Sequence, residues 1–181
     1  MYKQITVLIV ALMILNYNYA QTGNSDSIHK NMNSKEEAFA RQVFEAFKNN
    51  DEALYANLQP TNEEYKALLQ LVLAAKVEGI TQQKIDEMME WRKKEAPERM
   101  KSDFNKFQHQ ADSCGITWAD AVYQNYDWQE MYPEEFHQKY LYGTVWFAIN
   151  GVRYMIEDLQ AVEIPTGYKL QKIYRIRKAE E

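Results

Sequence analysis

The chain has 181 residues and a formal net charge of −5, with 46% hydrophobic and 26% charged residues. This composition is typical of a globular protein with its own core and excludes disordered, collagen-like and disulfide-rich classes. Nucleic acid is excluded as a partner, because binding to it depends on clustered basic groups that this acidic chain lacks. Cys114 is the single cysteine, so the core forms without an internal disulfide.

The start of the chain predicts export. Residues 5–15 are apolar apart from Thr6 and follow one positive charge at Lys3. An apolar run of this length fits a secretory signal peptide and is shorter than the ~20 residues of a membrane-spanning helix. We therefore expect a signal peptide over residues 1–20, and no membrane insertion after its removal.

The remaining chain is expected to contain one domain. Residues 21–33 are polar and lack periodicity, which favours a flexible leader, and no linker divides residues 34–181. The mature protein is then periplasmic or secreted. Its oligomeric state stays open.

Helical periodicity dominates residues 34 to about 114. We expect a first helix over residues 34–48, a short second helix capped by Asp51, and a third that begins at Thr61 with the spacing of a capping box. The third helix contains YKALLQLVLAAKV and is apolar on nearly all sides, so we expect it to be the most buried. Gly79 is expected to end it.

Thr81 is placed to cap the next helix, which we expect Pro97 to interrupt, because proline breaks a helix interior but is tolerated in a first turn. A new helix from about Pro97 then buries residues at steps of three and four, and Gly115 ends it. The expected buried stripe is Met100, Phe104, Phe107, Ala111 and Cys114.

After Gly115 the period changes to two and aromatic residues become frequent, which predicts strands. We expect strands over residues 118–125, 139–149, 152–157 and 168–177, with an irregular connection over residues 127–138 and a tight turn at Asn150 and Gly151. On the last strand, one face is expected to carry Tyr168, Leu170, Tyr174 and Ile176, with Lys172 as an exception.

These elements predict an α+β fold. The N-terminal helices (about 34–114) are expected to pack on one face of a C-terminal four-stranded antiparallel meander (about 118–177), whose other face is exposed to solvent.

Several local patterns resemble a known group of proteins. They are the FxxxVFxAF helix, the DxxLxxxL turn into Pro-Thr-x-x-Glu, the step from Gly115 to Trp118 and the Asn-Gly hairpin. Together they resemble uncharacterised exported proteins of Gram-negative bacteria, several of which are similar to the cystatin-like roll of the nuclear-transport-factor-like superfamily. The resemblance implies a curved sheet and helices around a cone-shaped cavity that binds ligands, or in some relatives performs catalysis. It assigns no catalytic residue.

Common catalytic and cofactor motifs are missing from the sequence. His29, His109 and His137 are scattered and form no metal-binding spacing, and no serine lies in a G-x-S-x-G elbow. Cys114 lies on an apolar stripe, which favours an inert thiol. No Walker loop or G-x-G-x-x-G is present, so we expect no nucleotide cofactor and no metal.

The segment around residues 126–137 is the first candidate site. Acidic residues lie there beside aromatic rings, a combination that suits sugar or peptide binding, or a general acid of raised pKa. The alternative is a polar loop whose rings fold onto the sheet. The candidate residues are Tyr126, Trp128, Tyr132, Glu135 and His137.

A second candidate is an aromatic face of the strands, formed by Tyr140, Tyr142, Trp146 and Tyr154. Tyrosine and tryptophan combine a flat apolar body with a polar edge, which suits binding of glycans or peptides. The alternative is that these rings fill the core. Arg153, Arg175 and Arg177 either bind an anion or protect a sheet edge.

The sequence as a whole therefore predicts a non-enzymatic binding domain of the cell envelope, with a small ligand, glycan or envelope protein as partner. The alternative is a small cavity enzyme, a hydrolase or isomerase, that uses a buried carboxylate or His137. An open pocket around His137 or Glu135 would favour the enzyme, whereas an apolar-filled space between helices and sheet would favour the binding domain.

Overall fold

A computed structural model describes residues 34–133 and 138–179 of the chain. The expected signal peptide, the leader, Glu135 and His137 lie outside these residues. Four α-helices come first in the described chain: α2 (Ser34–Lys48), α3 (Glu52–Leu58), α4 (Asn62–Ala74) and α5 (Gln82–Ser113). A short 3₁₀ turn, η2 (Trp118–Asp120), leads into the strands β1 (Val122–Met131), β2 (Tyr140–Ile149), β3 (Val152–Ile164), β4 (Gly167–Lys172) and β5 (Arg175–Lys178). The α+β fold expected from the sequence is confirmed.

The helix starts follow the polar residues that precede them. Asp51 accepts a hydrogen bond from the amide of Leu54, and Thr81 accepts one from Lys84. Thr61 and Glu64 form the complete capping box, in which each side chain accepts from the other residue's amide. These side chains satisfy amides that a first helical turn leaves unpaired, so the predicted starts of α3, α4 and α5 are confirmed.

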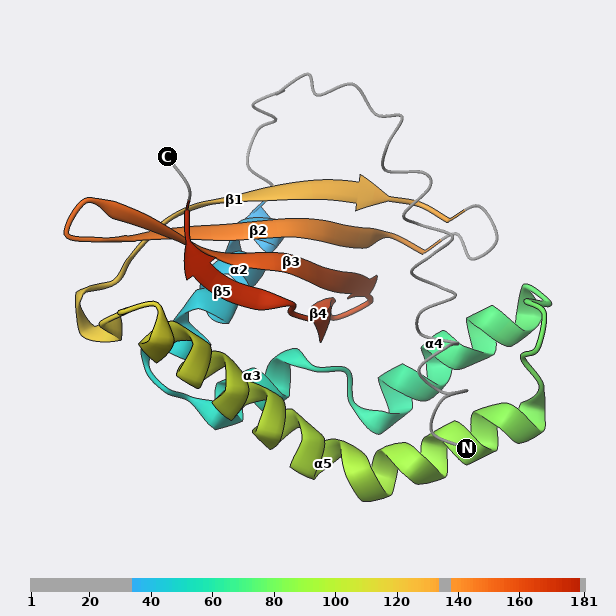
Figure 1. Cartoon of the computed structure of the whole chain (residues 1–181). Coiled ribbons are helices and arrows are strands. Elements are labelled where there is room, and N and C mark those ends of the chain that lie inside the picture. Colours follow the sequence, from blue (N-terminus) through green and yellow to red (C-terminus); the bar gives the residue numbers. More distant parts are fainter. Residues whose placement is uncertain (1–33, 134–137, 180–181) are drawn as a thin grey trace. The chain divides into compact units, whose positions relative to one another are not determined.

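The predicted interruption at Pro97 is wrong, because α5 runs without a break from Gln82 to Ser113 and contains Pro97 in its interior. Figure 1 shows that α5 instead bends along its length. Proline deprives the carbonyl four residues earlier of its helical donor and pushes that turn aside, which bends a helix when packing holds both halves in place. Gly115 ends α5 with φ 71°, as expected.

The expectation that the third helix is the most buried is also wrong. In α4 only Leu69 and Val72 are buried, and Leu71 is 42% exposed. Figure 1 shows the reason: α4 and the first half of α5 run side by side beyond the β4 end of the sheet, so α4 packs mainly against α5. We call these two segments, residues 62–74 and 82–96, the helical arm.

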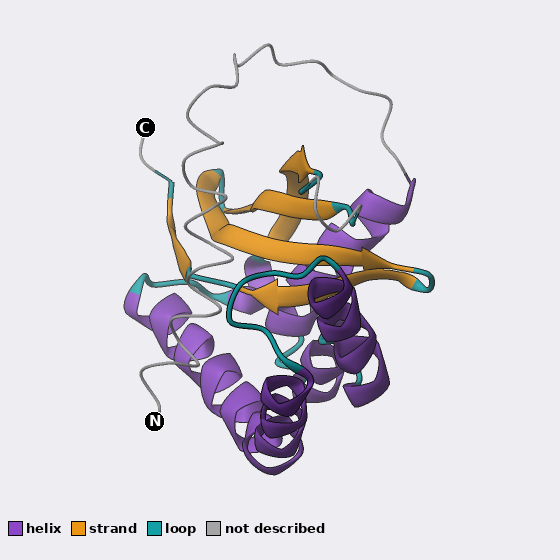
Figure 2. Cartoon of the chain, turned by 90° about the vertical axis from the view of Figure 1, so that its right-hand side faces the viewer, coloured by secondary structure: helices purple, strands orange, loops and turns teal. Residues whose placement is uncertain are grey.

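The strands form one antiparallel sheet in the order β1-β2-β3-β4, and β5 pairs with β3 beside β4. Helices cover one face of this sheet (Figure 2), which we call the inner face. We call the opposite face the outer face. The hairpin between β2 and β3 turns at Asn150 (φ 50°) and Gly151 (φ 83°), as predicted.

The strand boundaries differ from the prediction at three places. The first strand begins only at Val122 and continues to Met131, through half of the predicted irregular connection. The third strand continues to Ile164. The last strand is interrupted between Lys172 and Arg175, so Ile173 is buried and Tyr174 is 39% exposed, the reverse of the predicted alternation.

Two irregularities in the pairing of β3 account for this reversal. Asp158 has a left-handed φ of 55°, and the register of β3 against β2 shifts at the same place. An extra residue in one strand offsets the alternation of side chains across it. The register of β4 against β3 also shifts, between Leu170 and Lys172, and this second offset explains why Lys172 broke the predicted pattern.

The core lies between α2, α3, the second half of α5 and the inner face. The predicted stripe of α5 is confirmed at Phe104, Phe107 and Ala111, which are buried, whereas Met100 and Cys114 are only half-buried. Phe104 stacks on Phe47 at a ring distance of 5.4 Å and lies 5.1 Å from Tyr55. These contacts join α2, α3 and α5 in one apolar layer. Across the part of the chain that the structure describes, no helix combines the length and apolar character required to span a membrane.

Candidate functional site

Three aromatic side chains form a row on the outer face. Tyr140, Tyr142 and Trp146 alternate along β2 with Leu141, Val145 and Phe147, which point into the core. All three rings are half-buried, and Tyr140 and Trp146 lie opposite Val162 and Met155 of β3. At the rise of a strand, Tyr142 and Trp146 are roughly 13 Å apart, a span suited to a ligand longer than a single sugar ring.

Polar groups flank this row. The hydroxyl of Tyr142 donates to Oδ1 of Asp158 at 2.5 Å, and the guanidinium of Arg153 lies 4.6 Å from the centre of the Trp146 ring. Burial raises the pKa of Tyr142 and the hydrogen bond to Asp158 raises it further, so the hydroxyl stays protonated. The bulge at Asp158 therefore places a carboxylate beside the aromatic row.

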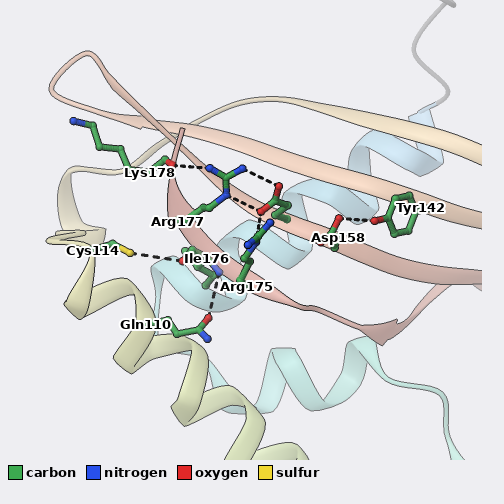
Figure 3. A network of polar contacts seen from close by, with 9 residues as sticks. Gln110, Cys114, Tyr142, Asp158, Arg175, Ile176, Arg177 and Lys178 are labelled. Atoms are coloured by element: carbon green, nitrogen blue, oxygen red, sulfur yellow. Dashed lines mark hydrogen bonds and ion pairs between the residues drawn. The ribbon is translucent and has the colours of Figure 1, made fainter. Parts of the chain in front are cut away.

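Glu157, next to the bulge, holds two arginines of β5 (Figure 3). Its Oε2 accepts from Nε of Arg175 at 2.5 Å and from Nε of Arg177 at 2.7 Å. These hydrogen bonds, with that from Arg177 the largest contribution, outweigh burial and lower the pKa of Glu157 to about 2. Arg175 and Arg177 thus fix β5 to β3, which supports the structural alternative for these two residues.

Tyr154 does not belong to the aromatic row. It lies on the inner face, is 8% exposed and stacks on Phe147 at a ring distance of 5.6 Å. The bulge comes after Tyr154, so β3 presents Tyr154 and Ile156 to the helices in register with Phe147 and Val145. The prediction that Tyr154 shares a face with Tyr142 and Trp146 is therefore wrong.

The first candidate segment is split between two environments. Tyr126 and Trp128 lie on the inner side of β1, 5.9 Å apart, where Trp128 also contacts Phe39 of α2. Tyr132 is 59% exposed, and its hydroxyl donates to Glu130. The aromatic residues of β1 therefore pack against the core, as the alternative interpretation proposed, whereas Tyr132, just after β1, lies exposed.

A buried ionic cluster lies beside this segment and was missed from the sequence. Nζ of Lys139 donates to Glu36 at 2.6 Å and to Glu130 at 2.8 Å, and the hydroxyl of Tyr168 donates to the same oxygen of Glu36 at 3.1 Å. Glu36 is only 8% exposed. The burial of Glu36 could have been predicted from the sequence, because helical spacing puts it on one face of α2 with Ala40, Val43 and Phe47.

The electrostatics of this cluster favour a fixed ion pair. Burial alone would lower the pKa of Lys139, but its hydrogen bonds to Glu130, Glu36 and Tyr168 outweigh burial and raise it. Burial raises the pKa of Tyr168 to about 12. Lys139 therefore stays charged and Tyr168 protonated at neutral pH, so neither is set up to exchange a proton.

The space between α2 and the sheet is filled by aromatic side chains. The ring of Phe147 lies 5.7 Å from that of Phe44 and 5.1 Å from that of Trp118. Trp118 stacks in turn on Phe47 at 6.1 Å. This packing occupies the place where the resemblance to cystatin-like rolls implied a cavity.

The remaining candidate groups lie apart from the aromatic row. His109 and the half-buried Cys114 line a shallow groove of about 1010 Å³ between α5 and β5, and the thiol donates weakly to the carbonyl of Ile176 at 3.7 Å (Figure 3). Within residues 34–133 and 138–179, no three His, Cys, Asp or Glu side chains gather in a way that would hold a metal ion.

Among the described residues, the aromatic row with Asp158 and Arg153 brings together flat apolar rings, a carboxylate and a guanidinium on one face of the sheet. Comparison with known proteins identifies no relative: no family model, no curated protein and no solved structure matches the chain.

Proposed function

We propose that the chain is an exported binding domain of the cell envelope that binds a glycan on the outer face of its sheet. The observation that carries this proposal is the row of Tyr140, Tyr142 and Trp146 on the face opposite the helices. Such rings present an apolar surface with polar edges, and Asp158 adds a hydrogen-bond acceptor beside them.

The filled inner face supports a binding domain over the alternative of a cavity enzyme. Glu36 is the described carboxylate that best fits a buried acid, but one of its oxygens already accepts hydrogen bonds from both Lys139 and Tyr168. A substrate would have to displace Phe44, Trp118 or Phe147 to enter between helix and sheet. On the outer face the rings of Tyr140, Tyr142 and Trp146 are already partly exposed, although their neighbours Met155 and Val162 are buried.

Binding is tested by calorimetry with hexasaccharides of glucose and of N-acetylglucosamine and with an unstructured acidic or basic peptide. We expect one of the hexasaccharides to bind, and Trp146→Ala to weaken binding at least about fivefold, since truncation of a stacked ring costs about 1–3 kcal/mol. Trp91→Ala is the matched control, because Trp91 lies in the helical arm. Binding of peptides alone, or equal binding by Trp146→Ala, contradicts the proposal.

Export is tested separately. Mass spectrometry of the protein from its native host should show loss of the first ~20 residues. An intact N-terminus on the protein in that host would contradict the export claim and leave glycan binding to be judged by calorimetry.

A further inference from the structure

A small pocket lies where the helical arm meets the rest of the fold. It has a volume of about 280 Å³, which is roughly the volume that nine water molecules occupy in liquid water. Its walls come from the end of α3, the start of α4, the bend of α5 and β4. We call it the bend pocket; its lining includes Pro60, Asn62, Arg92, Lys93, Pro97 and Lys169.

The charged side chains that line the bend pocket are all positive. Arg92, Lys93 and Lys169 line it, whereas none of the described residues that line it is acidic. This is unusual in a chain whose formal net charge is −5. The first turn of α4 carries Glu63 and Glu64 just outside this lining, so the positive charge at the pocket comes from the three side chains and not from the helix end.

Two of the three cations already have carboxylate partners. Lys93 pairs with Glu90 at 3.0 Å, and Lys169 lies 3.7 Å from Glu64 and donates to the carbonyl of Asn57. These contacts hold Lys169 between β4 and the α3–α4 connection. They leave Arg92 as the cation whose charge a ligand would neutralise.

Arg92 carries a half-buried charge with no carboxylate against it in the described chain. One of its terminal nitrogens donates to the carbonyl of Pro60, and its guanidinium lies 4.3 Å from the centre of the Tyr65 ring. Its Nε is buried without a hydrogen-bond acceptor. A desolvated guanidinium is costly unless it is paired, and one carbonyl with one ring compensates it only in part.

The uncharged part of the lining is mostly apolar and indicates which kind of group a ligand would place against it. Ala56, Pro60, Ala96, Pro97 and Met100 contribute apolar surface to the pocket. A guanidinium fits a carboxylate through parallel hydrogen bonds, and the apolar residues fit a short hydrocarbon stem. From this combination we infer that the bend pocket binds a small organic carboxylate, with its head group against Arg92 and its stem against the bend of α5.

The inference is tested by an amide NMR titration of the full chain with hexanoate, with hexanamide as the neutral isostere and with inorganic phosphate. We expect saturable shifts with hexanoate at the amides of residues 56–59, 61–62, 92–96 and 169, and binding of hexanamide and of phosphate at least tenfold weaker. Arg92→Gln should weaken hexanoate binding about tenfold or more. Arg99→Gln, on the same helix but outside the pocket, should leave it unchanged.

Arg92 also contacts Pro60, so a second variant separates binding from folding. Ala56 is exposed and lines the pocket, so Ala56→Glu should keep the melting temperature within a few degrees and abolish hexanoate binding by supplying a competing carboxylate. Absence of saturable hexanoate binding to the wild-type chain overturns the inference. Equal binding of hexanamide or phosphate, or undiminished binding by Ala56→Glu, overturns it as well.

Discussion

Truncation of Phe104 tests the packing of the helices against the sheet. Phe104 is 1% exposed and packs against the rings of both Phe47 and Tyr55, which also contact each other. Phe104→Ala removes a complete buried ring and leaves a cavity that three elements line, so we expect a loss of about 3–5 kcal/mol in the free energy of unfolding. For a domain of this size the melting temperature should fall by about 6–20 °C.

Leu71→Ala is the matched comparison. Composition alone ranks the helix of Leu71 as the most buried, whereas the structure leaves Leu71 42% exposed on the helical arm. We therefore expect Leu71→Ala to cost less than about 1 kcal/mol. Both variants are measured by urea unfolding, with the slope of the transition checked for constancy. Equal losses for the two variants, or a loss below about 1 kcal/mol for Phe104→Ala, would refute the packing described here.

Three further predictions concern single contacts. The lowered pKa of Glu157 means that its two arginine contacts stabilise the fold above pH ~4.5, and that about 1–3 kcal/mol is lost as the pH falls toward 2. Urea unfolding at several pH values should show this loss in the wild type and not in Glu157→Gln; identical pH profiles would contradict it. Lys139→Met should cost about 3–5 kcal/mol because it leaves Glu36 buried without its cation, and the double variant with Glu36→Gln should recover part of that loss in a thermal melt. No recovery would mean that the pair is not coupled. Gly143→Ala should cost about 1–3 kcal/mol, since its Cβ would lie 1.7 Å from a backbone oxygen of β1; an unchanged melting temperature would show that β1 moves freely.

Local signals in the sequence were sufficient for the helix starts and for the hairpin. Asp51, Thr61 and Thr81 cap their helices, and Asn150 with Gly151 turns between β2 and β3. Each of these features depends on hydrogen bonds or φ angles within a few residues, so a short stretch of sequence determines it.

The errors concern features that depend on distant residues. The burial of α4 depends on which elements pack against it. Despite its apolar composition, α4 packs mainly against α5 and not against the sheet. The continuity of α5 through Pro97 and the offset at Asp158 likewise depend on the packing of neighbouring elements. A period of two along the last strand could not reveal a bulge in its partner strand.

The same distinction applies to the candidate site. Alternation along one strand correctly placed Tyr140, Tyr142 and Trp146 on a common face. It failed for Tyr154, although the two-residue turn predicted at Asn150 and Gly151 already sets Tyr154 opposite Phe147 and so on the inner face. Arg92 and Lys169 lie far apart in the sequence and line the same pocket only after folding, so no local pattern indicated it.

The most direct test of ligand binding on the outer face uses the four tryptophans. Each indole gives one signal in a ¹⁵N NMR spectrum: Trp91 in the helical arm, Trp118 and Trp128 against the core, and Trp146 on the outer face. Addition of the hexasaccharide that binds in calorimetry should shift the Trp146 signal and leave those of Trp118 and Trp128 in place. Shifts at Trp118 or Trp128 with an unmoved Trp146 would show that the ligand enters between helices and sheet, and would contradict the account.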